Sequence, residues 1–149
     1  MLIVGKKVFV GLSTRTNAAA VEQFRTILAP HGYSVTPAAV RGCLHLKSAV
    51  TALSDDMVLV NPEWIDPGIF DGMAVVEADP SEPAAANALR LDDRIVFPAS
   101  FPRTASRIEA LGFKLALVDA TEAAKAEGAV TCCSLIVTSH KSQVVSHKS

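Results

Sequence analysis

The sequence is poor in cysteine and in aromatic residues, and its charges are almost balanced. Only three of its 149 residues are cysteines, and two of these are adjacent, which excludes the disulfide framework of a small secreted domain. Aromatic residues make up 5% of the chain and the net charge is −1, so neither a basic nucleic-acid surface nor an acidic interaction tail is expected.

Long hydrophobic runs are also absent. Half of the residues are hydrophobic, yet no run approaches the roughly 18 residues that a membrane-spanning helix needs. The apolar residues 1–4 are too short for the hydrophobic part of a signal peptide and run directly into Gly-Lys-Lys. We therefore expect a cytoplasmic protein without a membrane partner, and the length fits one domain with a hydrophobic core.

The chain does contain an alternation of strand-like and helix-like segments. Val21, Phe24 and Leu28 recur at helical spacing and give residues 16–28 one apolar face. Further helical segments are predicted at residues 62–70, 101–111 and 121–125. Strands are predicted at residues 7–10, 33–36, 44–53, 57–60, 74–78, 88–91, 94–98, 114–118 and around Cys132.

These segments form a repeat. The order strand, strand, helix, strand occurs twice between residues 44 and 118, and residues 2–36 fit a third copy. Repeated units of this kind bury their faces only by stacking on one another. No low-complexity segment interrupts residues 1–138, whereas the polar residues 139–149 repeat Ser-His-Lys-Ser and are expected to be a flexible tail without a catalytic role.

A nucleophilic cysteine site needs a thiol and an imidazole. These are offered by Cys132, in the strand-like residues 129–137, and by His45, in a second apolar segment. The thiolate attacks and the imidazole exchanges the proton. Neighbours on a strand point to opposite faces, so only one of Cys132 and Cys133 would face a site. The alternative is that the cysteines are small core residues and that His45 is a core histidine. A zinc site of two ligands falls short of the usual four, so no metal and no cofactor are predicted.

Three stretches carry a more specific pattern: residues 8–17 (VFVGLSTRTN), 43–48 (CLHLKS) and 127–136 (EGAVTCCSLI). Together, in this order and at these intervals, they resemble the dimethylarginine dimethylaminohydrolases, guanidine-modifying enzymes of the pentein superfamily. Weaker agreement at Asn61-Pro62 and at residues 85–87 (AAN) extends the match over residues 3–137. The resemblance implies an α/β fold, a partial pentein α/β-propeller of about three ββαβ modules plus a closing strand, with residues 1–138 as the C-terminal portion of the catalytic domain.

The resemblance also implies a role for each site residue. Cys132 would be the nucleophile and Cys133 a core residue, His45 the proton donor and acceptor, and Arg15 the group that binds the substrate carboxylate. The backbone at Ala126 and Glu127 would bind the amino-acid end of the substrate. The alternative interpretations, from the sequence alone, are a surface cation near a helix start for Arg15 and an exposed acid in a turn for Glu127.

The implied reaction is hydrolysis of an Nω-methylated arginine to citrulline and an alkylamine through a covalent thiouronium on Cys132. The carboxylates that hold the guanidinium would belong to an N-terminal half, so the expected partners are a small guanidino amino acid and either that half or a second copy of the chain. Lys47 stands where arginine deiminases have Asp, which favours the dimethylarginine branch. Two alternatives remain: a non-catalytic amino-acid-binding or self-associating pentein fragment, and a deiminase-like guanidino hydrolase.

Overall fold

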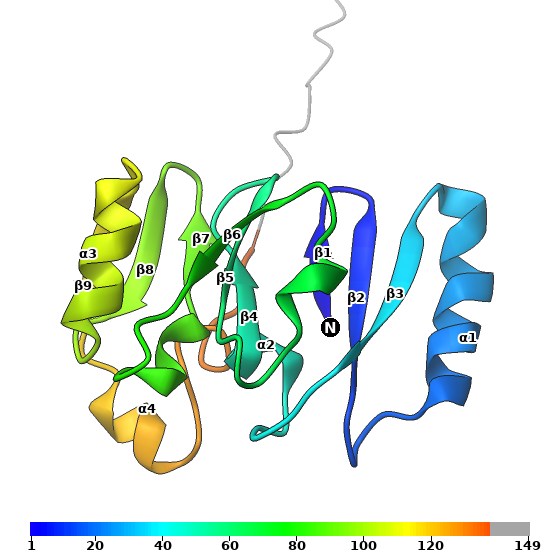
Figure 1. Ribbon diagram of the computed structural model, residues 1–149, viewed down its shortest axis with the longest axis horizontal. Coiled ribbons are helices and arrows are strands. Elements are labelled where there is room, and N and C mark those ends of the chain that lie inside the picture. Colours follow the sequence, from blue (N-terminus) through cyan, green and yellow to red (C-terminus); the bar gives the residue numbers. More distant parts are fainter. Residues whose placement is uncertain (138–149) are drawn as a thin grey trace, which may run out of the picture.

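Three small sheets follow one another along the chain in the computed structural model, which describes residues 1–137 (Figure 1). In each sheet the first two strands pair antiparallel, and the third pairs parallel with the second. A parallel neighbour requires a crossover connection, which here contains a helix or a 3-10 turn. The chain is therefore built from ββαβ modules, as its repeated element order predicts. The tail predicted over residues 139–149 lies outside the described residues.

The elements of the modules have the following bounds. The first module contains β1 (Leu2–Val4), β2 (Lys7–Leu12), α1 (Ala18–Leu28), η1 (Ala29–His31) and β3 (Ser34–Ala39). The second contains α2 (Leu46–Ala49), β4 (Val50–Ala52), β5 (Met57–Val60), η2 (Pro67–Ile69) and β6 (Ala74–Glu77). The third contains η3 (Pro83–Ala86), β7 (Leu89–Leu91), β8 (Arg94–Pro98), α3 (Pro102–Ala110) and β9 (Lys114–Val118), and is followed by α4 (Thr121–Lys125).

Shared hydrophobic cores join consecutive modules. Phe9 of the first module and Phe70 of the second are fully buried, with ring centroids 4.9 Å apart. The second and third modules meet in another core, in which Leu59 packs with Phe97 and Ile108. Figure 1 shows the result: the three sheets lie side by side, with α1 beyond one end and α3 at the other. Stacking thus buries the faces that each module alone leaves open.

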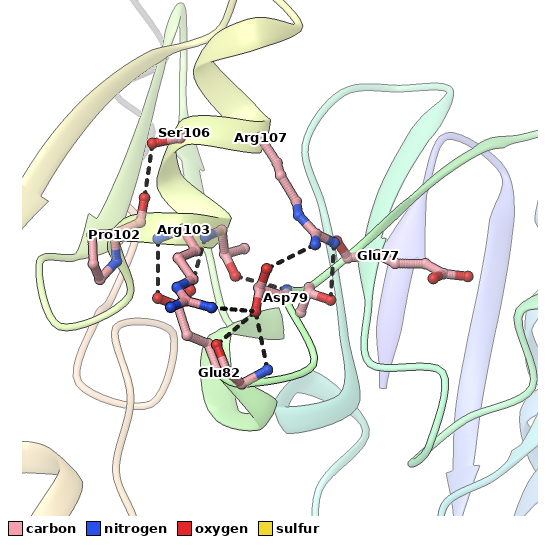
Figure 2. A network of polar contacts seen from close by, with 10 residues as sticks. Glu77, Asp79, Glu82, Pro102, Arg103, Ser106 and Arg107 are labelled. Carbon is pink, nitrogen blue, oxygen red and sulfur yellow. Dashed lines mark hydrogen bonds and ion pairs between the residues drawn. The ribbon is translucent and has the colours of Figure 1, made fainter.

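A carboxylate at the start of α3 ties this helix to the segment that follows β6. Glu82 is 8% exposed, and its carboxylate accepts hydrogen bonds from the backbone N–H groups of Arg103 (3.0 Å) and Thr104 (2.8 Å). Burial by itself raises the pKa of Glu82, but these bonds outweigh it and hold the pKa below its ordinary value. Figure 2 shows Asp79 beside them, where it pairs with Arg107 at 2.8 Å.

The strand predicted over residues 44–53 is wrong. Residues 46–49 form the short helix α2, and only residues 50–52 are extended. Leu46 and Ala49 are three residues apart and both fully buried, which is the spacing of one helical face rather than of a strand. Leu44, in contrast, is exposed.

The closing strand predicted around Cys132 is also not formed within the described residues. Residues 130–133 make a turn in which the N–H groups of Cys132 (2.9 Å) and Cys133 (3.2 Å) both donate to the carbonyl of Ala129. A strand needs a neighbouring strand for its backbone groups, and residues 1–137 offer none at this place. The apolar sequence therefore does not decide the local structure. No helix among the described residues is long and apolar enough to cross a membrane.

Candidate active site

A cavity of about 490 Å³ brings together three of the five predicted site residues. Arg15 from the loop after β2, His45 from the loop before α2 and Cys132 from the turn after α4 all line it. The cavity thus collects a thiol, an imidazole and a guanidinium from segments that are far apart in the sequence. These are the groups that the predicted chemistry requires from this chain.

Arg15 lies at the carboxyl end of β2, in a tight turn. Ser13 and Thr16 form a bridge across this turn, with N–H to carbonyl distances of 3.3 and 3.4 Å, and the N–H of Arg15 donates to the Ser13 hydroxyl at 3.2 Å. Asn17 then caps α1, its side-chain oxygen accepting from the N–H of Ala20 at 3.0 Å. The cap explains why the helix begins at residue 18 rather than at residue 16, and it leaves Arg15 in the loop at the cavity.

His45 is exposed, so its interpretation as a core histidine is wrong. It occupies the position before α2 with an extended backbone, and its carbonyl accepts from the N–H of Ser48 at 2.9 Å. The Cys43 thiol also donates to this carbonyl, at 3.5 Å. Burial raises the pKa of Cys43, which makes this thiol a weaker nucleophile than an exposed one. The imidazole of His45 itself makes no hydrogen bond to residues 1–137.

Cys132 and Cys133 are both exposed, so neither is the core residue that the alternative interpretation required. They face different spaces: Cys132 lines the cavity with His45, and Cys133 lines another cavity of about 270 Å³ beside α4. The expected divergence of the two side chains therefore arises from a turn rather than from a strand. The assignment of Cys133 to the core is wrong.

Ala126 and Glu127 lie apart from the cavity that contains Cys132. Glu127 lines a second cavity of about 350 Å³, to which His45 also contributes, whereas Ala126 ends α4 and lines neither. Glu127 has a positive φ of 57°, and the next residue, Gly128, returns its N–H to the carbonyl of Ala123 at 2.8 Å. Neither carbonyl, of Ala126 or of Glu127, accepts a hydrogen bond from residues 1–137.

The charges around the larger cavity are all positive. Arg15 and Lys47 line it, and none of its lining residues is acidic. Positive groups of this kind attract a carboxylate and favour a thiolate, but they give a guanidinium no partner. None of the following aspartates lines either cavity that His45 borders: Asp55, Asp56, Asp66, Asp71 and Asp79.

One residue at the site has a role that the sequence does not reveal. Asn87 is 2% exposed and hydrogen-bonds both to Thr131, next to Cys132, and to the backbone of Lys47, near His45. The only sign of it in the sequence is the short agreement at residues 85–87, because a buried amide between two loops has no local periodicity.

Two of the curated proteins that this chain resembles share one name. The chain is 33% identical over 135 residues to an N(G),N(G)-dimethylarginine dimethylaminohydrolase of Pseudomonas aeruginosa. The matched region covers 91% of this chain and 53% of that protein. It is 40% identical over 136 residues to the enzyme of the same name from Streptomyces coelicolor, with 91% and 52% covered. The chain thus spans about half the length of these relatives. No protein-family model matches.

Solved structures show the same relationship in the fold. The Pseudomonas aeruginosa enzyme, as a cysteine-to-serine mutant complexed with citrulline, matches with a TM-score of 0.80 and 32% identity over 88% of this chain and 51% of its own. An amidinotransferase of saxitoxin biosynthesis from Microseira wollei matches with a TM-score of 0.77 at 22% identity, which shows a shared fold alone. By sequence and by fold, the chain is similar to the dimethylarginine dimethylaminohydrolases over about half of their length.

Proposed function

We propose that this chain is the cysteine-bearing part of an enzyme that hydrolyses an Nω-methylated arginine to citrulline and an alkylamine. The observation that carries the proposal is the single cavity lined by Arg15, His45 and Cys132, in a chain 33 to 40% identical to dimethylarginine dimethylaminohydrolases. A relative complexed with citrulline supports a small guanidino amino acid as the substrate. A cytoplasmic location fits this chemistry, because a reducing compartment keeps the Cys132 thiol free.

The residues support a covalent mechanism in two stages. The Cys132 thiolate attacks the guanidinium carbon and forms a C–S bond, and His45 gives its proton to the departing amine as the C–N bond breaks. His45 then takes a proton from the water that attacks the thiouronium carbon. The C–S bond breaks and the added hydroxyl loses its proton to solvent, where the released amine takes one up, so neutral citrulline leaves and the thiolate is restored. Each proton that His45 gives in the first stage is recovered in the second.

Formation of the thiolate is the electrostatic requirement of this mechanism. A free thiol with an ordinary pKa of about 8.5 is mostly protonated at neutral pH, and nearby positive charge favours its ionised form. Lys47 and Arg15 supply such charge at the cavity, and the substrate guanidinium adds to it on binding. Arg15 would bind the substrate carboxylate through two parallel hydrogen bonds, and the free carbonyls of Ala126 and Glu127 would accept from the substrate ammonium group.

Recognition of the guanidinium requires groups from outside this cavity. The cavity has cations and no carboxylate, and loss of substrate orientation costs on the order of 7 kcal/mol of the barrier. We infer that residues 1–138 act with a complementary N-terminal half, or a second copy of the chain, that supplies the acidic groups. Half of the length of each curated relative lies outside the matched region, which supports this division.

Covalent labelling of the isolated chain tests the nucleophile. 4-Chloro-2-hydroxymethylpyridine, which forms an adduct with a relative, is the reagent, and mass spectrometry locates the modified residue. We expect modification at Cys132, its loss in Cys132→Ser and its retention in Cys133→Ser. The last variant is a matched control because Cys133 is exposed and adjacent but lines a different cavity. Equal labelling of both cysteines would contradict the assignment.

Hydrolysis of asymmetric dimethylarginine, measured as citrulline formation, tests the reaction. Turnover by the chain alone that disappears in Cys132→Ser would place the guanidinium-binding carboxylates within these 149 residues. Turnover only after a complementary half is added supports the divided enzyme. Activity on free arginine but not on dimethylarginine would favour a deiminase-like enzyme.

A second candidate function rests on the charge of the cavity. A pocket with Arg15 and Lys47 and no acid suits an α-carboxylate, so a chain that binds citrulline without turning over any guanidino substrate would be an amino-acid-binding protein. Calorimetry measures citrulline binding by the parent chain and by Arg15→Lys. Citrulline binding by a chain whose Cys132 is unreactive favours the binding protein.

A further inference from the structure

We propose that Asn87 is a positioning residue that holds the turn of Cys132, residues 130–133, against the segment of His45, residues 45–47. This inference rests on the proposed function, in which these two residues act as a pair. Asn87 follows η3 and precedes β7, so it belongs to the third module, and its side chain hydrogen-bonds to neither Cys132 nor His45. Its side chain is 2% exposed.

The amide of Asn87 joins the two segments through three hydrogen bonds. Its Nδ2 donates to the carbonyl of Lys47 at 2.8 Å and to the hydroxyl of Thr131 at 2.8 Å, and its Oδ1 accepts from the N–H of Thr131 at 3.1 Å. A carbonyl only accepts and a backbone N–H only donates, so this chemistry fixes the orientation of the amide. Reversing it would break the bonds to the Lys47 carbonyl and to the Thr131 N–H, whereas the Thr131 hydroxyl could still donate to the amide oxygen.

The two bonded residues are next to the reacting pair. Thr131 directly precedes Cys132, and Lys47 follows His45 by two residues at the start of α2. Within residues 1–137 no backbone hydrogen bond joins these two segments directly. The amide of Asn87 is therefore their polar connection.

The turn of Cys132 depends on this connection more than a strand would. It belongs to no sheet, and the bonds made by Cys132, Cys133 and Ser134 end on Ala129 and Val130 of the same turn. Such bonds set the shape of the turn but not its place in the molecule. Asn87 supplies the bonds that tie it to a buried part of the fold.

Asn61 provides a matched control. It is 4% exposed, its Nδ2 donates to the carbonyl of Pro83 at 2.8 Å, and its Oδ1 accepts from the N–H of Glu63 at 2.9 Å. The buried amide is thus bonded in the same manner as that of Asn87. The side chain of Asn61 hydrogen-bonds neither to the turn of Cys132 nor to the segment of His45, so its loss reports the general cost of removing a buried amide.

The test measures how strongly His45 affects the thiol of Cys132 in the full chain. The rate of alkylation by iodoacetamide is followed at Cys132 by mass spectrometry, with and without His45→Ala, in the parent, in Asn87→Leu and in Asn61→Leu. An imidazolium beside a thiol raises its thiolate fraction by about tenfold. We expect His45→Ala to slow alkylation by about this factor in the parent and in Asn61→Leu, and to have no effect in Asn87→Leu.

The outcomes separate this inference from the proposed function. A tenfold effect of His45→Ala that persists in Asn87→Leu overturns the positioning role and leaves the pair of Cys132 and His45 standing. No effect of His45→Ala in the parent overturns the pair, and the positioning role with it.

A milder variant keeps the test decisive if Asn87→Leu does not fold, as judged by its circular dichroism. Thr131→Val removes only the hydroxyl that accepts from Asn87 and retains the other two bonds. The effect of His45→Ala should then be reduced but not lost. A full tenfold effect in Thr131→Val contradicts the proposal.

Discussion

The position of His45 depends on a single glycine three residues before it. Gly42 has a φ of +67°, and a Cβ at this position would lie 2.7 Å from Nε1 of Trp64. The neighbouring Arg41 donates its N–H to the carbonyl of Trp64 at 2.8 Å, which fixes the loop from the other side. The loop thus has a backbone conformation and a close approach that only glycine satisfies.

We expect Gly42→Ala to destabilise the protein by about 2 to 4 kcal/mol, the sum of a left-handed backbone of about 1 kcal/mol and a steric clash of about 1 to 3. Gly5→Ala is the matched control: Gly5 has a φ of +56° and nothing within 4 Å of the added Cβ, so it should cost only the backbone part. Urea unfolding of both variants measures the difference. Equal losses in the two variants would show that Trp64 adjusts without cost.

The sequence predicts well those strands that pair with a neighbour inside their own module, and the helix that follows the third module. The strands at residues 57–60, 94–98 and 114–118 and the helix at residues 121–125 occur with the predicted bounds. In contrast, residues 44–53 and the turn of Cys132 are mispredicted. Both are apolar, and in both the structure depends on partners that are distant in the sequence. Leu46 and Ala49 pack into a core shared with other elements, and Thr131 hydrogen-bonds to Asn87. Three residues named from the sequence, Arg15, His45 and Cys132, line one cavity, whereas the elements beside His45 and Cys132 were not predicted.

The start of α3 gives a prediction about pH. The pKa of Glu82 is lower in the folded chain than in the unfolded one, so its contribution to stability is present above the ordinary Glu pKa of about 4.3 and is lost as the pH falls through the folded value. We expect Glu82→Gln to lower the free energy of unfolding by about 1 to 3 kcal/mol at pH 7, since it loses charge-assisted bonds to two N–H groups.

The difference between Glu82→Gln and the parent should shrink below pH 4, as measured by urea unfolding across pH. Glu109→Gln, on the exposed side of the same helix, should show no comparable loss at pH 7. A difference that is constant from pH 7 to pH 3 would mean that the Glu82 charge does not contribute, and that only the packing of its side chain does.

At the scale of the whole molecule, three modules form an open arc that leaves apolar side chains exposed on two strands at sheet edges. Ile3 on β1 is 51% exposed and Leu117 on β9 is 54% exposed, and each strand lies at the edge of its sheet. Unpaired edges with exposed apolar side chains favour association with another chain. The same association would bring groups of another chain to the cavity, whose own charged side chains are all cations.

We therefore expect the isolated chain to self-associate, and Ile3→Lys or Leu117→Lys to shift it towards the monomer in sedimentation velocity, because a buried charge without a partner opposes an apolar interface. Ile27→Lys is the matched control: Ile27 is 64% exposed but lies on α1 rather than on a sheet edge, so its substitution should leave the distribution unchanged.

A parent chain that is monomeric at every concentration would show that these edges are tolerated in water. A complementary half, not a second copy, would then be the partner to seek, because the cavity would still lack an acid for the guanidinium. An equal shift in all three lysine variants would instead indicate a general effect of added charge, and the edge strands would have no special part in assembly.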